Sequence, residues 1–251
     1  MINFLQLLFK RLAFNFKASN GKGHGVHSPF VYRFITEILN DRRFFYSFET
    51  IETQKAIFIG ATKNLTNKKH SANIQSMLNC LPTDKYQQLL FKMVHYYQID
   101  SVLEIGSSLG ISSAYLSAAN GESKILNLVE SPIQKLLSLE NLKETFVNNV
   151  TVIEASDLNL GLRVSDKNKF GLILFNCSQI NQDINLSEVL KIAKEDCILL
   201  FFSHNESFKY NPLWNKSLNY PQTSISIELM NLRILFFRKE QYEKEHYTIQ
   251  F

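Results

Sequence analysis

Two glycines and a glutamate stand at a spacing that suits ligand binding. Gly106 and Gly110 follow the apolar residues 101–105 and precede residues 111–119, which are mostly small. Glycine permits a tight turn and a close approach of a ligand to the backbone. A helix that starts after such a turn presents free N–H groups and a positive dipole end to an anionic group. The stretch therefore predicts a strand, a binding turn and a helix.

The spacing also restricts the ligand. A dinucleotide fingerprint has a third glycine, in the middle of the turn, where the pyrophosphate approaches the backbone, and this glycine is absent between Gly106 and Gly110. Glu130 ends a second apolar stretch about 20 residues later, where an acid commonly binds ribose hydroxyls. These features predict a nucleoside with a small anionic tail, and S-adenosylmethionine fits that description.

Two resemblances follow from these and other residues. The run Glu104-Ile-Gly-Ser-Ser-Leu-Gly110 together with Glu130 resembles the class I S-adenosylmethionine-dependent methyltransferases, especially the catechol-type O-methyltransferase branch. Residues 24–32 and 236–241, with His246, resemble an uncharacterised group of methyltransferase-like proteins of Bacteroidetes bacteria. Together the two cover nearly the whole chain. The first is fairly specific for fold and cofactor, whereas the second carries no known chemistry.

The pattern after Asp100 predicts the fold. Strands and helices alternate, as in βαβ units with a parallel sheet. The predicted strands are residues 101–105, 124–130, 149–154, 170–175 and 197–202, followed by an antiparallel hairpin of residues 225–230 and 232–238. The resemblance implies a Rossmann-like α/β fold with a seven-stranded, mostly parallel sheet. We expect residues 1–82 to form an N-terminal helical extension or cap and residues 83–251 to form the methyltransferase-like domain.

Within the N-terminal part, Ser28 and Pro29 predict the start of a helix that runs to about Asn40. Residues 60–69 are polar and predict a loop, and Thr83 predicts the start of the next helix. Residues 1–17 have an amphipathic, basic pattern too short and charged for a transmembrane helix, and they lack a signal-peptide cleavage site. A helix docked on the protein or a second subunit is favoured over one on a membrane surface.

Composition predicts an ordinary soluble protein. The chain has 251 residues, of which 45% are hydrophobic and 20% charged, which suits one α/β domain with an extension. Its net charge of +4 is spread along the chain, which indicates a solvated surface and no nucleic-acid footprint. The three cysteines lack metal-site or redox spacing, so reduced thiols and a cytoplasmic location are expected. The phenylalanine-rich N-terminus is compatible with a homodimer.

The resemblance also assigns cofactor-binding residues. It implies that Gly106, Ser107 and Gly110 shape the turn around the methionine part and that Ser156, or its backbone, borders the adenine. Glu104 is expected to order the turn and is a candidate to hold the ammonium group, directly or through water. Glu130 is expected to accept the ribose hydroxyls.

The catalytic positions depart from the family. Metal-dependent O-methyltransferases carry an aspartate after strand four and further Asp or Asn ligands after strand five. This chain has Asn176 at the first position and His204-Asn205-Glu206 at the second, which is a poor site for Mg²⁺. We therefore predict no catalytic metal. Asn176 is expected nearest the methyl group, and the candidates for the base are His204, Glu206 and His27.

Two functions remain open on these residues. One is a metal-independent methyltransferase that acts on a small-molecule acceptor, with oxygen as the acceptor atom that the resemblance implies. The other is a degenerate relative that binds S-adenosylmethionine, or nothing, and serves as a binding or regulatory module. A dehydrogenase is a more distant alternative because the pyrophosphate glycine is missing, and a purely structural protein would show no affinity for the cofactor.

Overall fold

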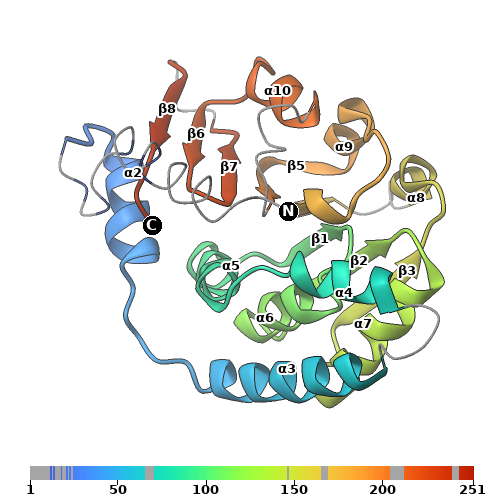
Figure 1. Ribbon diagram of the computed structural model, residues 1–251. Coiled ribbons are helices and arrows are strands. Elements are labelled where there is room, and N and C mark those ends of the chain that lie inside the picture. Colours follow the sequence, from blue (N-terminus) through green and yellow to red (C-terminus); the bar gives the residue numbers. More distant parts are fainter. Residues whose placement is uncertain are drawn as a thin grey trace.

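A single mixed sheet forms the centre of the computed structural model (Figure 1). The structure describes residues 12, 14, 18, 21, 23, 25–65, 71–145, 147–164, 169–203, 212–238 and 243–251. Its strands are β1 (Ser101–Ile105), β2 (Lys124–Val129), β3 (Val150–Glu154), β4 (Phe170–Asn176), β5 (Ala193–Phe202), β6 (Ile225–Glu228), β7 (Leu232–Phe236) and β8 (Glu245–Thr248). They are arranged in the order β3-β2-β1-β4-β5-β7-β6-β8.

The direction of the strands confirms the predicted fold class. β1 pairs in parallel with β2 and β4, and further parallel pairs join β2 to β3 and β4 to β5. β7 runs antiparallel to both β5 and β6, as the predicted hairpin requires. The structure adds an eighth strand, β8, which pairs in parallel with β6 at the edge of the sheet. The carboxyl ends of β1 to β4 therefore meet at one edge.

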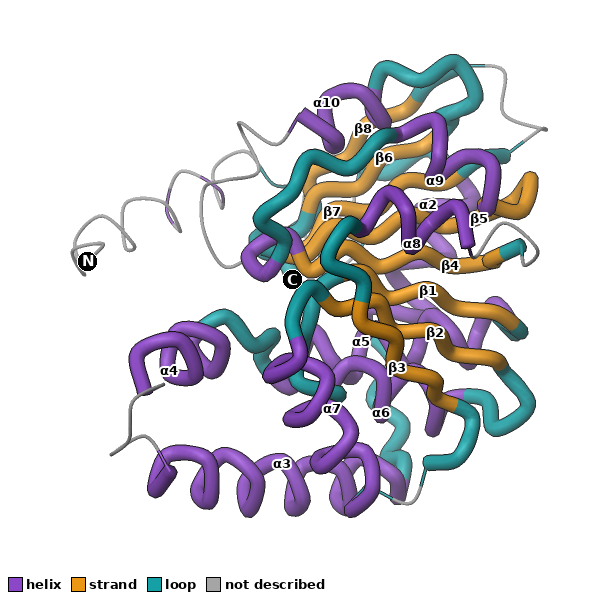
Figure 2. Tube along the Cα trace, turned by 90° about the vertical axis from the view of Figure 1, so that its right-hand side faces the viewer, coloured by secondary structure: helices purple, strands orange, loops and turns teal. Residues whose placement is uncertain are grey.

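Helices cover both faces of the sheet, because the inner strands are largely apolar and their successive side chains point to opposite faces. Leu172 and Leu174 of β4 belong to the core on one face, and Ile173 and Phe175 belong to the core on the other. The first face carries α2 (Pro29–Arg33), the π-helix η1 (Phe34–Leu39), α3 (Tyr46–Leu65), α4 (Ser71–Asn79), α5 (Asp84–Tyr97), α6 (Ile111–Ala119) and α7 (Pro132–Glu144). The second carries α8 (Leu158–Val164), α9 (Leu186–Ile192) and α10 (Pro212–Leu218), of which α8 and α9 lie toward the viewer in Figure 2.

The N-terminal helices confirm two predictions and correct one. Helix α2 follows Ser28 as N-cap with Pro29 at its first turn, and α5 follows Thr83. The predicted loop at residues 60–69 is wrong for residues 60–65, which form the last part of α3. Ile51 and Thr62 of α3 are buried, and α3 lies along the outside of α6 and α7 (Figure 1). This packing outweighs the polar composition. Residues 66–70 and the helix expected at residues 1–17 fall mainly outside the described residues.

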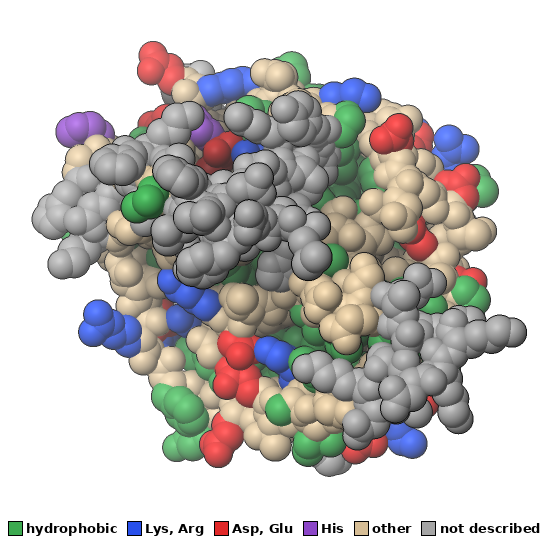
Figure 3. Space-filling view, in the orientation of Figure 1, with side chains coloured by type: hydrophobic (Ala, Val, Ile, Leu, Met, Phe, Trp, Pro, Cys, Tyr) green, Lys and Arg blue, Asp and Glu red, His purple; other side chains and the backbone are tan. Residues whose placement is uncertain are grey.

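Charged side chains of both signs are interspersed on the face of the molecule shown in Figure 3. Among the described helices, none has the length and apolar character needed to cross a membrane.

Candidate functional site

The turn after β1 has a backbone that requires glycine at both ends. Gly106 and Gly110 adopt φ angles of +84° and +78°. A Cβ atom on Gly106 would lie 3.0 Å from Cγ1 of Ile180 and 3.1 Å from the carbonyl oxygen of Asn176. On Gly110 it would lie 2.8 Å from the carbonyl oxygen of Ser138 in α7. The turn is therefore closely packed against the end of β4 on one side and α7 on the other.

A buried carboxylate holds this turn in place. Glu104, near the end of β1, has no exposed surface. Its Oε1 accepts hydrogen bonds from Ser108 Oγ at 2.6 Å and Asn176 Nδ2 at 2.7 Å, and its Oε2 accepts one from the Ser113 hydroxyl. Burial raises the pKa of Glu104, against the opposing effect of these hydrogen bonds. Glu104 thus links β1 to the turn, to α6 and to β4.

Asn176, the last residue of β4, leaves one polar atom without a partner. Its Nδ2 also donates to the carbonyl oxygen of Gly106 at 3.2 Å. The side chain is buried, and its Oδ1 has no hydrogen-bond partner among the described residues. A buried acceptor without a donor is costly. A ligand with a donor beside Gly106 would satisfy it.

Ser107 forms hydrogen-bond contacts that stabilise the turn. Its Oγ accepts a hydrogen bond from the Leu109 N–H at 3.0 Å and lies 3.3 Å from Oγ of Ser138. These contacts join the turn to α7 and complete its ordering.

Glu130, directly after β2, is half-buried and already engaged. Its Oε1 accepts a hydrogen bond from the backbone N–H of Asn181, and its Oε2 accepts one from Nδ2 of the same residue, both at 3.0 Å. Asn181 follows β4 and the short 3-10 helix Cys177–Gln179. The carboxylate predicted to bind ribose therefore holds a residue of the chain itself.

Ser156, after β3, is contacted by the segment that follows β4, which also contains Asn181. Its carbonyl oxygen accepts a hydrogen bond from Nε2 of Gln182 at 2.7 Å. The N–H of Leu158 donates to Oε1 of Gln182 at 3.1 Å. Gln182 thus joins the segment after β4 to the segment after β3.

The structure brings most of the predicted site residues to one edge of the sheet. These are Glu104, Gly106, Ser107, Gly110, Glu130, Ser156 and Asn176, at the carboxyl ends of β1 to β4. His27 is not among them. His27 is exposed and precedes α2. Phe30 of α2 packs on Phe236, which pairs with Ile198. This pair lies toward the end of the sheet opposite to the carboxyl ends of β1 to β4. His204, Asn205 and Glu206 lie outside the described residues.

Sequence reasoning missed the segment that covers this site. Ile180, Asn181 and Gln182 were not predicted to contact it, and they reach the ends of three strands. The only signal was a polar run, residues 181–183, a few residues after the apolar strand that ends near residue 176. In the described ranges, no group of three or more His, Cys, Asp or Glu side chains is placed to hold a metal ion.

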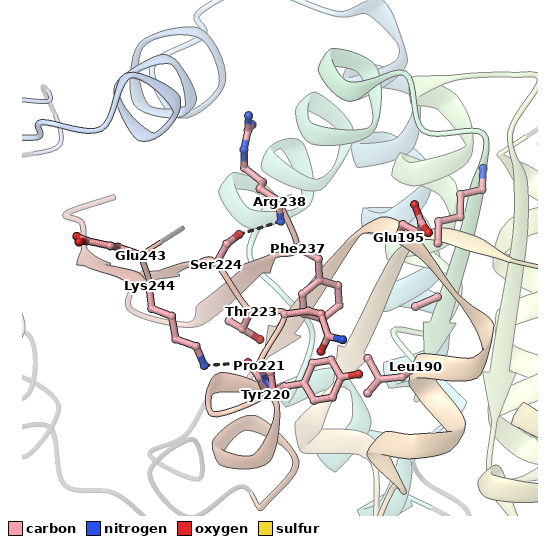
Figure 4. A pocket seen from close by; sticks show the side chains of 13 residues that line it. Leu190, Glu195, Tyr220, Pro221, Thr223, Ser224, Phe237, Arg238, Glu243 and Lys244 are labelled. Atoms are coloured by element: carbon pink, nitrogen blue, oxygen red, sulfur yellow. Dashed lines mark hydrogen bonds between the residues drawn. The ribbon is translucent and has the colours of Figure 1, made fainter. Parts of the chain in front are cut away.

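A separate cavity of about 510 Å³ lies at the opposite edge, beside the start of β5 and the end of β7. Figure 4 shows Tyr220, Phe237 and Leu190 around it, whereas the side chain of Arg238 points away. Two hydrogen bonds cross its rim, from the Arg238 N–H to Ser224 Oγ and from Lys244 Nζ to the carbonyl oxygen of Tyr220. None of the residues that line it belongs to the predicted site.

This chain matches solved structures but no known sequence family. No protein-family model and no curated protein match the sequence. Solved structures do match. An O-methyltransferase from Bacillus cereus in complex with S-adenosylhomocysteine is 14% identical, with a TM-score of 0.57, and the match covers 82% of this chain and 96% of that one.

Two further enzymes give similar values. The O-methyltransferase TomG from Streptomyces achromogenes, in complex with S-adenosylmethionine, is 12% identical with a TM-score of 0.55, over 78% of this chain and 90% of that one. A methyltransferase from Podospora anserina bound to S-adenosylhomocysteine is 13% identical with a TM-score of 0.54, over 85% and 97%. At these identities the likeness establishes the fold, and the chain has the fold of S-adenosylmethionine-dependent O-methyltransferases.

Proposed function

We propose that this protein transfers a methyl group from S-adenosylmethionine to an oxygen of a small molecule, without a catalytic metal. The observation that carries the proposal is the turn after β1, held by the buried Glu104 and flanked by Glu130 at the end of the neighbouring strand. In open α/β sheets, ligands bind outside the carboxyl ends of the strands. The similar structures from Bacillus cereus and Streptomyces achromogenes contain S-adenosylhomocysteine and S-adenosylmethionine.

The residues present fit this cofactor. Gly106 leaves no side chain between the turn and a ligand, and Asn176 Oδ1 is an acceptor for the ammonium group of the methionine part. Glu130 supplies a carboxylate for the ribose hydroxyls, and the backbone at Ser156 and Leu158 offers an acceptor and a donor for the adenine. In the observed structure Ile180 lies against Gly106, Asn181 occupies the Glu130 carboxylate, and Gln182 occupies the backbone groups of Ser156 and Leu158, so binding requires these three residues to move.

The proposed chemistry needs little from the protein beyond alignment and deprotonation. The bound cofactor supplies an electrophilic methyl group. The chain must hold the acceptor oxygen in line with that group and remove its proton. His204 and Glu206, which follow β5, are the proposed candidates for the base. Asn176 stands where metal-dependent relatives carry an aspartate, and this supports a reaction without a metal ligand at the end of β4.

A second function is favoured by one observation. Both carboxylate oxygens of Glu130 already accept hydrogen bonds from Asn181. If this contact is permanent, the protein is a binding or regulatory module that has kept the fold and lost the reaction. The N-terminal helices, residues 1–82, would then serve as an interaction surface instead of a cap over the cofactor.

Thermal melts with S-adenosylmethionine, S-adenosylhomocysteine and NAD test the proposal. A ligand at about 100 times its dissociation constant adds roughly 2.7 kcal/mol, a shift of about 5–11 °C at roughly 2–4 °C per kcal/mol. The first two compounds should produce the shift, and NAD should not, because the turn lacks a pyrophosphate glycine. Transfer of labelled methyl groups to small phenols and alcohols, with and without EDTA, then tests the reaction and its independence of metal.

The cofactor proposal is overturned if neither compound binds the wild-type chain or a double variant with Asn181 and Gln182 replaced by alanine. Binding by either protein without transfer to any acceptor would favour the binding module.

A further inference from the structure

Three consecutive residues after β4 lie across the proposed cofactor site. Ile180 packs against the turn, where its Cγ1 would be 3.0 Å from a Cβ on Gly106. Asn181 bonds to Glu130 after β2, and Gln182 bonds to the backbone after β3. Residues 180–182 therefore follow the line along which the proposed cofactor would place its methionine part, ribose and adenine.

Asn181 reproduces the hydrogen bonds of a ribose. Its backbone N–H and its Nδ2 donate separately to the two oxygens of Glu130, each at 3.0 Å. Two adjacent hydroxyl groups donate to a carboxylate in the same way when an acid at the end of the second strand binds a ribose. The two occupants use the same oxygens, so they exclude each other.

Gln182 reproduces the hydrogen bonds of an adenine edge. Its carboxamide donates to the Ser156 carbonyl oxygen at 2.7 Å and accepts from the Leu158 N–H at 3.1 Å. Adenine likewise presents an amino donor beside a ring-nitrogen acceptor. The backbone after β3 thus presents one acceptor, the Ser156 carbonyl oxygen, and one donor, the Leu158 N–H. An adenine edge needs the same pair of groups.

We propose that residues 180–182 are an internal substitute for the nucleoside, which keeps the site closed until the cofactor displaces it. This inference rests on the proposed function and assigns it a form of self-regulation. A closed state lowers the apparent affinity by the fraction of molecules that are open. The cofactor therefore binds in competition with the chain's own side chains.

The structure also provides space for the displaced segment. A cavity of about 380 Å³ lies on the side of residues 180–184 that faces α10, and Phe175, Leu213 and Lys216 complete its wall. Exposed residues such as Asn181 and Asp183 line this cavity, so it opens to the surface and leaves the segment room to move. Asn181 is itself exposed, which makes local opening inexpensive.

Affinity for S-adenosylhomocysteine, measured by titration calorimetry, tests the competition. Asn181→Ala removes one of the two bonds to Glu130, and Gln182→Ala removes both bonds to the backbone after β3. Each variant should bind about tenfold more tightly than the wild type, which corresponds to about 1.4 kcal/mol. Asn219→Ala is the matched control, because Asn219 is an exposed amide beyond α10 whose Nδ2 donates to the carbonyl oxygen of Asn215, four residues earlier. It should bind like the wild type.

Hydrogen exchange provides a second measurement that needs no activity. Without ligand, the N–H groups of Asn181 and Leu158 should both be protected, because each donates to a side chain across the site. Saturating S-adenosylhomocysteine should speed the exchange of Asn181 and leave Leu158 protected, since the adenine replaces Gln182 at that position. A melt of each variant near the wild-type temperature shows that the fold is intact.

The outcomes separate the two proposals. Wild-type binding that is equal to or tighter than that of both variants, with Asn181 still protected in the complex, overturns the inference and leaves the cofactor site standing. The segment would then be a fixed wall. No binding by any protein, including the double variant, overturns the proposed function and the inference with it. Binding by the double variant alone supports both and shows a site that is closed in the wild type.

Discussion

Replacing Gly110 with alanine tests the packing of the turn after β1. The φ of +78° costs an L-residue about 1–2 kcal/mol. The new Cβ would lie 2.8 Å from the carbonyl oxygen of Ser138 and 3.0 Å from Cγ of Leu142. The first contact is with the backbone of α7, which cannot move away as a flexible side chain could. Overpacking therefore adds about 1–3 kcal/mol to the loss of stability. The expected loss of stability is about 2–5 kcal/mol, or about 4–20 °C in melting temperature.

The measurement is a comparison of thermal melts with a matched variant, Gly60→Ala. Gly60 is exposed in α3, and a Cβ there would meet nothing within 4 Å. Alanine at this helical position should raise stability by about 0.5–1 kcal/mol. A Gly110→Ala protein that melts within about 2 °C of the wild type, less than the shift expected for one lost kcal/mol, would refute the close approach of the turn to α7.

Three further predictions concern charge and reactivity. Burial raises the pKa of Glu104 above its ordinary 4.5, so its contribution to stability is complete below the unfolded pKa and is lost as pH rises through the folded one. As the pH rises above the ordinary carboxyl value of 4.5, the melting temperature of the wild type should therefore fall relative to that of Glu104→Gln. A difference that stays constant with pH would contradict this. The Cys197 thiol is buried with a raised pKa, so Ellman's reagent should modify it only after unfolding. Asp100→Ala breaks an exposed ion pair with Lys194 and should cost less than about 1 kcal/mol, with a smaller loss in 1 M salt.

The sequence predicted those elements that contain a continuous apolar run or apolar residues at helical spacing. The inner strands and the helix after Thr83 bury such residues, and their positions agree with the structure. β8 was not predicted because it reads Glu-His-Tyr-Thr and lies half-exposed at the sheet edge, where burial imposes no alternation. The extent of α3 was missed because packing on α6 and α7 decides it, and that packing cannot be read from local composition.

For the site, the sequence located the groups at strand ends but not what covers them. The spacing of Gly106, Gly110 and Glu130 identifies the turn and the carboxylate because each depends on local backbone geometry. The bonds of Asn181 to Glu130 join residues 51 positions apart through side chains in a loop, which no periodicity reveals. His27 failed to reach the site for the same reason, since the position of α2 is set by contacts such as Phe30 with Phe236.

The aromatic contacts of α2 and the adjoining η1 have a consequence for synthesis of the protein on the ribosome. The ring of Phe30 in α2 lies 4.9 Å from that of Phe236, and the ring of Phe34 in η1 lies 5.9 Å from it. At about 5–20 residues per second, α2 emerges about 10–40 s before β7. Until then its apolar side chains lack their partner. Nascent chains halted before β7 should therefore bind chaperones through α2 and release them once residue 236 has emerged.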